Sequence, residues 1–141
     1  PLFLFLTAAF VSGQTAADLD TLLNTDQVSY AWAARFVLPA AGLIGEDASP
    51  EASFNLAVEK GWFAKELSPE AAIPLKDLSY LCTEAFQIKG GLMYRLFSGP
   101  RYAYRELKYR KMIQGRSDPA QLVPGDRLIR IIGRILDEQG E

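Results

Sequence analysis

Tyrosines and basic residues are interleaved along the stretch between residues 94 and 110. This stretch contains Tyr94, Tyr102, Tyr104 and Tyr109 together with Arg95, Arg101, Arg105, Lys108 and Arg110. Flat aromatic rings stack on sugar rings, and a guanidinium fork binds carboxylates and phosphates through two hydrogen bonds at once. The combination favours an anionic glycan as ligand. Its candidate binding residues are Arg95, Arg101, Tyr102, Arg105 and Tyr109.

Two other interpretations of this stretch stay open. Aromatic and basic side chains also bind single-stranded nucleic acid, but the net charge of −2 and the absence of an RNA- or DNA-binding motif speak against such a partner. In the second alternative, Tyr104 and Leu107 belong to the core, and the other side chains only cover the outside of a helical bundle. We expect no nucleic-acid partner.

The chain offers little for catalysis or metal binding. It contains no histidine and one cysteine, Cys82, so histidine acid–base chemistry and a cysteine metal cluster are excluded. Paired carboxylates would suffice for a glycosidase, but the spacing of Glu59, Glu66, Glu84 and Glu106 singles out no pair. We therefore expect no enzymatic activity, no catalytic residues, no metal and no cofactor, and we expect Cys82 to be a small buried hydrophobe on a helix face.

The charges are distributed unevenly along the chain. From Asp18 to Lys60 there are seven acidic and two basic residues, whereas from Lys89 to Arg116 there are eight basic residues and one acidic residue. Such a dipolar molecule suits an acidic partner on one side, or a neighbour that docks head to tail. Two solvated helix faces of different charge would give the same pattern.

The first residues form an unbroken apolar run from Leu2 to Val11, followed by Ser12-Gly13-Gln14. This run is too short to span a bilayer, and it is typical of a secretory signal peptide that is cleaved after Gly13. A buried N-terminal helix or strand is the alternative. We predict a signal-peptide remnant at residues 1–13, a mature domain at residues 14–141 without a transmembrane segment, and export to the periplasm or cell envelope.

Six of the eight prolines form three pairs that share a separation of 50 residues. These pairs are Pro50 and Pro100, Pro69 and Pro119, and Pro74 and Pro124. Because proline fixes φ and donates no backbone hydrogen bond, its repeated spacing indicates repeated helix starts and loops. The pattern predicts two copies of one helical hairpin, preceded by a weaker first unit with helices at residues 15–26 and 30–41, the second of them with Ser29 as its N-cap. Residues 92–97 form a short apolar bridge to the last hairpin, whose second helix turns Leu128, Ile131, Ile132 and Ile135 inward. Since no convincing alternating strand pattern is present, we predict an all-α fold.

These repeated units resemble the S-layer homology family, whose unit is a helix, a glycine-containing turn, a loop with Asp or Asn and Pro, and a second helix. The matching runs are Ala57 to Phe63, Ser68-Pro69 and Ile73 to Leu78, and then Met112 to Gly115, Asp118-Pro119 and Val123 to Leu128. The resemblance implies a pseudo-threefold bundle with the second helices at the centre. It also implies non-covalent anchoring to envelope polysaccharide.

The resemblance adds two residues to the candidate site. The motif that opens the second helix of the first unit contains Tyr30 and Trp32, and in the family a binding groove lies there. The arginine that the family carries in this motif is replaced by Tyr30, Leu75 and Gly125. Two functions follow as expectations. The first is a non-catalytic module that binds cell-wall polysaccharide or peptidoglycan, and the alternative is a protein-interaction or oligomerisation domain of a larger envelope protein.

Overall fold

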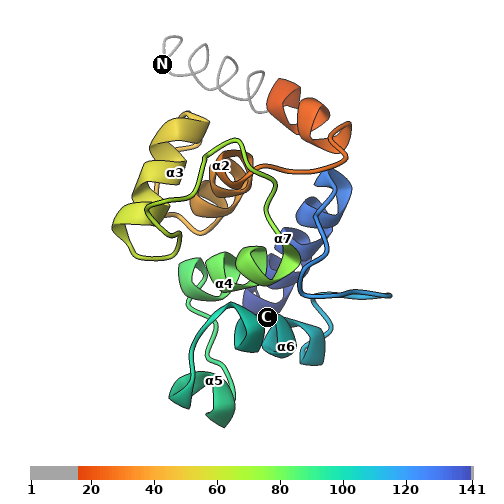
Figure 1. Ribbon diagram of the computed structural model, residues 1–141. Coiled ribbons are helices and arrows are strands. Elements are labelled where there is room, and N and C mark those ends of the chain that lie inside the picture. Colours follow the sequence, from red (N-terminus) through yellow and green to blue (C-terminus); the bar gives the residue numbers. More distant parts are fainter. Residues whose placement is uncertain (1–15, 141) are drawn as a thin grey trace.

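The protein is all-helical in the computed structural model, which describes residues 16–140 without the side chains of residues 92 and 93. Residues 16–23 are helical, and the further helices are α2 (Tyr30–Ala40), α3 (Pro50–Glu59), α4 (Leu75–Ala85), α5 (Leu92–Leu96), α6 (Pro100–Tyr109) and α7 (Gly125–Gln139) (Figure 1). No strand is present in this part of the chain, where only two isolated β-bridges occur. The all-α prediction is confirmed. The predicted signal peptide at residues 1–13 lies outside the described residues.

The prolines and Ser29 mark the helix starts that the sequence predicted. Pro50 and Pro100 are the first residues of α3 and α6, where a missing N–H costs no helical hydrogen bond. Pro74 and Pro124 stand one residue earlier, as the N-caps of α4 and α7. The Ser29 side chain accepts a hydrogen bond from the Trp32 N–H at 3.2 Å, which satisfies one free donor at the start of α2.

Four helices end in the same way, with one residue in the left-handed conformation. These residues are Gly42, Gly61, Gln87 and Lys111, with φ of 76°, 79°, 53° and 63°. In each case the following N–H reaches back to a carbonyl in the last helical turn, as Leu43 does to Leu38 at 3.0 Å. This is the Schellman arrangement, which turns the chain sharply and satisfies carbonyls at the helix end.

The openings of α2, α4 and α7 are joined to other parts of the chain by backbone hydrogen bonds. The N–H groups of Tyr30, Leu75 and Gly125 donate to the carbonyls of Ala71, Gln121 and Thr25, at 2.9, 2.8 and 2.9 Å. Residues 28, 73 and 123, which precede these openings, are fully buried. Each opening is therefore bonded to a loop that belongs to another part of the chain.

Apolar side chains of α2, α3, α4, α6 and α7 form a single core, to which Leu22 also belongs. The inward-facing residues predicted for α7 are buried, and they are Leu128, Ile131, Ile132 and Ile135. Helix α4 packs on α6, and α2 packs on α3. Cys82 lies on the inner face of α4 and is fully buried, as expected. This packing leaves α5 at one end of the molecule, supported by α6.

Candidate ligand-binding surface

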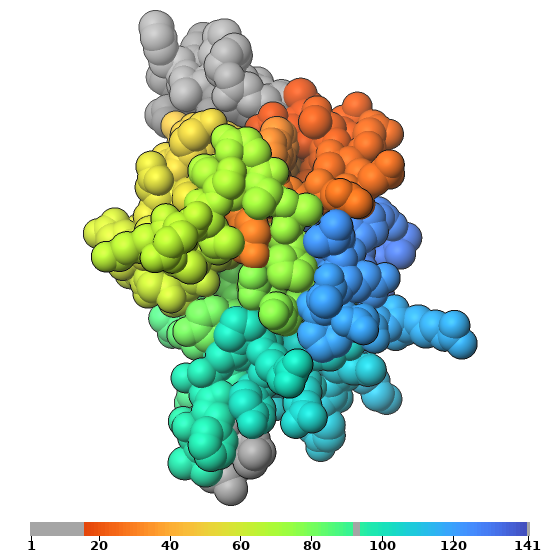
Figure 2. All heavy atoms as spheres, in the orientation of Figure 1, coloured from red at the N-terminus to blue at the C-terminus, as the bar shows by residue number. Residues whose placement is uncertain are grey.

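The predicted binding residues of the third unit lie around α5 and α6, at the lower end of the molecule in Figures 1 and 2. Residues 97–99 connect the two helices, and they place Phe97 against Tyr102. The two rings stack with their centroids 5.9 Å apart and their planes at 28°. The Arg105 guanidinium lies over the Tyr102 ring at 5.9 Å from its centroid, one helical turn further along α6. Phe97 is nevertheless 55% exposed.

The arginines of this surface have no ion-pair partner among the residues that the structure describes. Arg95, Arg101 and Arg105 are exposed, and none of them forms a salt bridge there. The one acidic residue of this region, Glu106, is engaged by Arg110, whose Nε lies 3.0 Å from its carboxylate. The positive charge of the surface is therefore not neutralised locally.

Arg110 has a structural role and does not belong to this free surface. Besides Glu106, it pairs with Glu138 of α7 at 3.0 Å and donates to the Lys89 carbonyl. These contacts tie α6 to the end of α7 and to the loop before α5.

Tyr109 completes the face of α6 that carries Tyr102 and Arg105. It lies seven residues after Tyr102, which is two helical turns, and its side chain is 84% exposed. Tyr104 points the other way. It is buried, and its hydroxyl shares a hydrogen bond of 2.6 Å with the Ser117 hydroxyl. The alternative that placed Tyr104 and Leu107 in the core is thus correct for these two residues.

A surface pocket of about 520 Å³ adjoins Arg95. It is lined by Ile88, Lys89, Gly90, Tyr94, Arg95 and Ser98. Tyr94 is buried here, and its hydroxyl donates to a Glu84 carboxylate oxygen at 2.6 Å. Burial and this hydrogen bond both raise the pKa of Tyr94, so the residue stays neutral. The pocket therefore presents its positive charges from Lys89 and Arg95.

We name one set of side chains the basic–aromatic surface: Arg95, Phe97, Arg101, Tyr102, Arg105 and Tyr109, all of which are exposed except the half-buried Tyr102. Phe97 and the neighbouring Leu96 had not been predicted as part of it, because the sequence presented residues 92–97 as a short apolar bridge. Leu96 is 63% exposed. The sequence feature that could have revealed both is an apolar pair directly before Ser98-Gly99-Pro100, where the chain turns and no helix face remains to bury them.

The prediction for Tyr30 is wrong. Its side chain is only 4% exposed, its ring meets Phe63 edge-on at 5.0 Å, and its hydroxyl donates to the Asp77 carboxylate. Burial, followed by the hydrogen bond and charge of Asp77, raises its pKa. Tyr30 thus joins α2 to α4 inside the core, because the helix opening that carries it is bonded to the loop before α4.

Trp32 lies apart from the basic–aromatic surface. It is half-buried on α2 and stacks on Phe36 with a centroid distance of 5.7 Å and an interplanar angle of 23°. Helix α2 packs on α3 and α4, in the other half of the molecule from α5 and α6 (Figure 1). The structure therefore does not bring Trp32 together with the arginines.

Other functional groups remain few in the described part of the chain. No three His, Cys, Asp or Glu side chains between residues 16 and 140 come together as a metal site would require. Two of the four glutamates considered for catalysis, Glu84 and Glu106, are engaged by Tyr94 and Arg110. None of the described helices is both long and apolar enough to cross a bilayer.

Comparison with protein-family models, curated protein sequences and solved structures gives no significant match to this chain. A function for this chain is therefore inferred from the geometry of the molecule alone.

Proposed function

We propose that this chain is a non-catalytic, exported module of the cell envelope that binds an anionic polysaccharide through the basic–aromatic surface. The observation that carries the proposal is the stacked pair Phe97 and Tyr102, with Arg105 above the Tyr102 ring and further unneutralised arginines beside it. Exposed rings provide apolar faces for sugars, and the free guanidinium groups provide bidentate donors for carboxylates or phosphates.

We further propose that the chain is a divergent S-layer-homology-like domain whose three units form a pseudo-threefold bundle. Support comes from the backbone hydrogen bonds at the three helix openings, next to the buried Val28, Ile73 and Val123. The opening of α2 bonds to the loop before α4, the opening of α4 bonds to the loop before α7, and the opening of α7 bonds to the segment before α2. The three bonds thus run in one direction around a ring, as a threefold arrangement requires.

The test is co-sedimentation of the protein with purified cell-wall sacculi at low and high salt. Exposed charges are screened within about 8 Å at physiological ionic strength, so binding through arginines weakens as salt rises. Arg101→Ala/Arg105→Ala is expected to lose pelleting. Lys65→Ala/Lys76→Ala is the matched control, because it removes two exposed positive charges outside this surface and is expected to pellet like the unchanged protein. Equal pelleting of both double variants, or none by the unchanged protein, would overturn the proposal.

A second candidate function, protein interaction within the envelope, is favoured by the exposed Leu96 and Phe97. Large apolar side chains at the centre of a polar surface are typical of protein interfaces. Such an interface would depend less on salt than a glycan site does. Binding of an envelope protein that survives high salt, together with no pelleting on sacculi, would select this function.

A further inference from the structure

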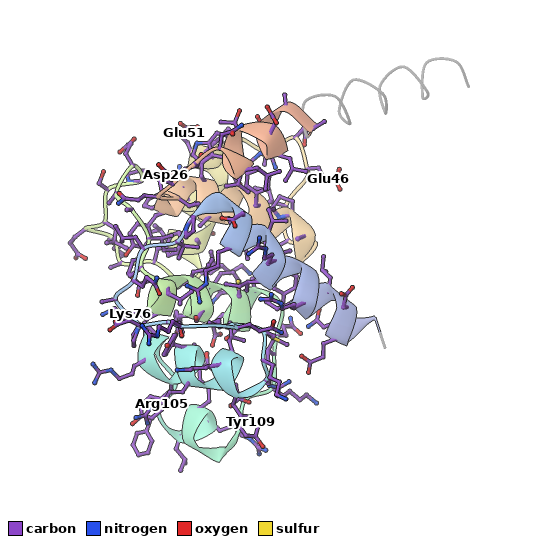
Figure 3. The ribbon with its side chains drawn as sticks, turned by 90° about the vertical axis from the view of Figure 1, so that its right-hand side faces the viewer. Asp26, Glu46, Glu51, Lys76, Arg105 and Tyr109 are labelled. Carbon is purple, nitrogen blue, oxygen red and sulfur yellow. The ribbon has the colours of Figure 1, made fainter. Side chains whose placement is uncertain are left out.

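The two ends of the molecule carry opposite charge, which extends the asymmetry found along the sequence. Figure 3 shows Asp26, Glu46 and Glu51 at one end, and Arg105 with Tyr109 at the other. The three acidic residues are exposed, as is Asp47 beside them. Because the basic–aromatic surface lies at the opposite end, the charges do not neutralise each other within one copy. They are free to attract a second copy.

The acidic end also contains an apolar hollow. This hollow has a volume of about 160 Å³ and is lined by Arg35, Phe36, Pro39, Ala40 and Glu46. A second hollow of about 300 Å³ shares Arg35 and includes Asp18 and Asp47 in its wall. Aromatic and aliphatic side chains thus lie next to carboxylates at this end.

The charge of Arg35 does not oppose a basic partner. Its side chain is only 7% exposed, and its guanidinium is paired with the Asp18 carboxylate at 3.2 Å. Arg35 therefore acts as a neutralised wall between the two hollows. Glu46 and Asp47 have no salt-bridge partner among the described residues, so they give this end its free negative charge.

The other end presents a side chain that fits the hollow. Phe97 stacks on Tyr102, over which Arg105 lies, and more than half of its surface is exposed. The exposed Arg95 and Arg101 are near it in the sequence. An apolar cavity of about 150 Å³ is large enough to hold benzene, so a hollow of about 160 Å³ has room for a phenylalanine ring. Insertion of the ring would bring the arginines around it toward Glu46 and Asp47.

We propose that the protein associates head to tail with copies of itself, with Phe97 of one copy inserted between Phe36 and Pro39 of the next. The arginines of the basic–aromatic surface then face Glu46 and Asp47 of that next copy. The two contact surfaces differ and lie at opposite ends, so each added copy leaves one contact surface free to bind the next copy. A contact of this kind does not close into a two-fold dimer and gives open filaments instead, or rings where the rotation between copies closes. The inference does not depend on glycan binding.

Complementary charge reversal tests the proposal. Sedimentation velocity of the full chain at low salt is expected to give a weight-average mass that rises with protein concentration. Glu46→Lys/Asp47→Lys gives the acidic contact surface the same positive charge as the arginines that face it, and Arg101→Glu/Arg105→Glu places negative charge opposite Glu46 and Asp47. Each variant alone is expected to stay monomeric, whereas an equimolar mixture regains association because opposite ends are again available. Phe97→Ala is expected to weaken association, while Leu136→Ala, which removes an exposed apolar side chain of α7 outside the basic–aromatic surface, is expected to keep it.

Three outcomes contradict the proposal. A monomeric unchanged protein at every concentration, association of either reversed variant alone at the original strength, or a mixture that stays monomeric would overturn it. Far-UV circular dichroism verifies that each variant is folded. Glu46→Lys/Asp47→Lys also separates this inference from the proposed function, because it keeps the basic–aromatic surface and should still pellet with sacculi.

Discussion

Gly125, the first residue of α7, provides the sharpest test of how the helix openings pack. A Cβ atom at this position would lie 1.7 Å from the Leu22 carbonyl oxygen and 2.6 Å from the Leu22 carbonyl carbon. Both distances are shorter than a real Cβ contact, and both atoms belong to backbone that cannot rotate away. In addition, the Gly125 N–H donates to the Thr25 carbonyl at 2.9 Å. Gly125→Ala must therefore separate α7 from residues 22–25.

The size of the effect follows from three terms. Forcing an extra methyl group into a packed contact costs about 1–3 kcal/mol. Loss of the hydrogen bond to Thr25 adds about 0.5–1.5 kcal/mol. Alanine is better than glycine in a helix by about 0.5–1 kcal/mol, which offsets part of this loss. Their sum is centred on about 2 kcal/mol, so we expect the free energy of unfolding to fall by about this amount and the melting temperature to fall by roughly 6–8 °C.

The assay is thermal and urea unfolding followed by far-UV circular dichroism, with Gly133→Ala as the matched control. Gly133 lies inside the same helix, and a Cβ there would meet nothing within 4 Å. The control is therefore expected to gain about 0.5–1 kcal/mol from helix propensity alone. If Gly125→Ala unfolds at the same temperature as the unchanged protein while Gly133→Ala is stabilised, the close packing of α7 on residues 22–25 is refuted.

The remaining predictions concern a helix end, the buried thiol and the two proposed interactions. Lys111→Gly should stabilise the protein by about 0.5–1 kcal/mol in urea unfolding, because φ of 63° is strained for lysine and free for glycine; Lys76→Gly, in the first turn of α4, should destabilise it. Burial raises the pKa of Cys82 from 9.0 to about 12, so the thiol should not react with a thiol reagent at pH 8 until the protein unfolds. The native state keeps this proton while the unfolded state releases it near pH 9, so the free energy of unfolding should fall as pH rises from about 9 toward 12, and less steeply in Cys82→Ala. The protein is expected to pellet with sacculi in a salt-sensitive way that Arg101→Ala/Arg105→Ala loses. Self-association is expected to return when the two charge-reversed variants are mixed.

The sequence predicted those parts of the fold that depend on local rules. Proline at a fixed spacing marked the starts of α3 and α6, because its φ and its missing N–H are properties of the residue itself. Helical periodicity predicted the inward face of α7, because the 3.6-residue repeat is also a local property of the sequence. Serine at position 29 was predicted as an N-cap and is one.

The failures involve partners that are distant in sequence. Tyr30 is buried against Phe63 and Asp77, which belong to other elements. The sequence around residue 30 therefore does not predict these contacts. The burial of Arg35 was not predicted either, because its partner Asp18 precedes the otherwise apolar helix α2 in which Arg35 is the one charged residue. In contrast, Arg101, Arg105 and Tyr109 of α6 are exposed, because a polar helix face needs no distant partner to stay in water.

The charges of α6 are not explained by the stability of the helix. Arg101 lies in its first turn, where no acidic residue is present and the helix dipole disfavours positive charge. Arg101 and Arg105 are also four residues apart, and like charges at this spacing destabilise a helix by about 0.2–0.5 kcal/mol. An anion bound between them would reverse both effects, whether it is a glycan carboxylate or the Glu46 carboxylate of a second copy. The unfavourable local placement of these arginines therefore supports an external anionic partner, whichever of the two it is.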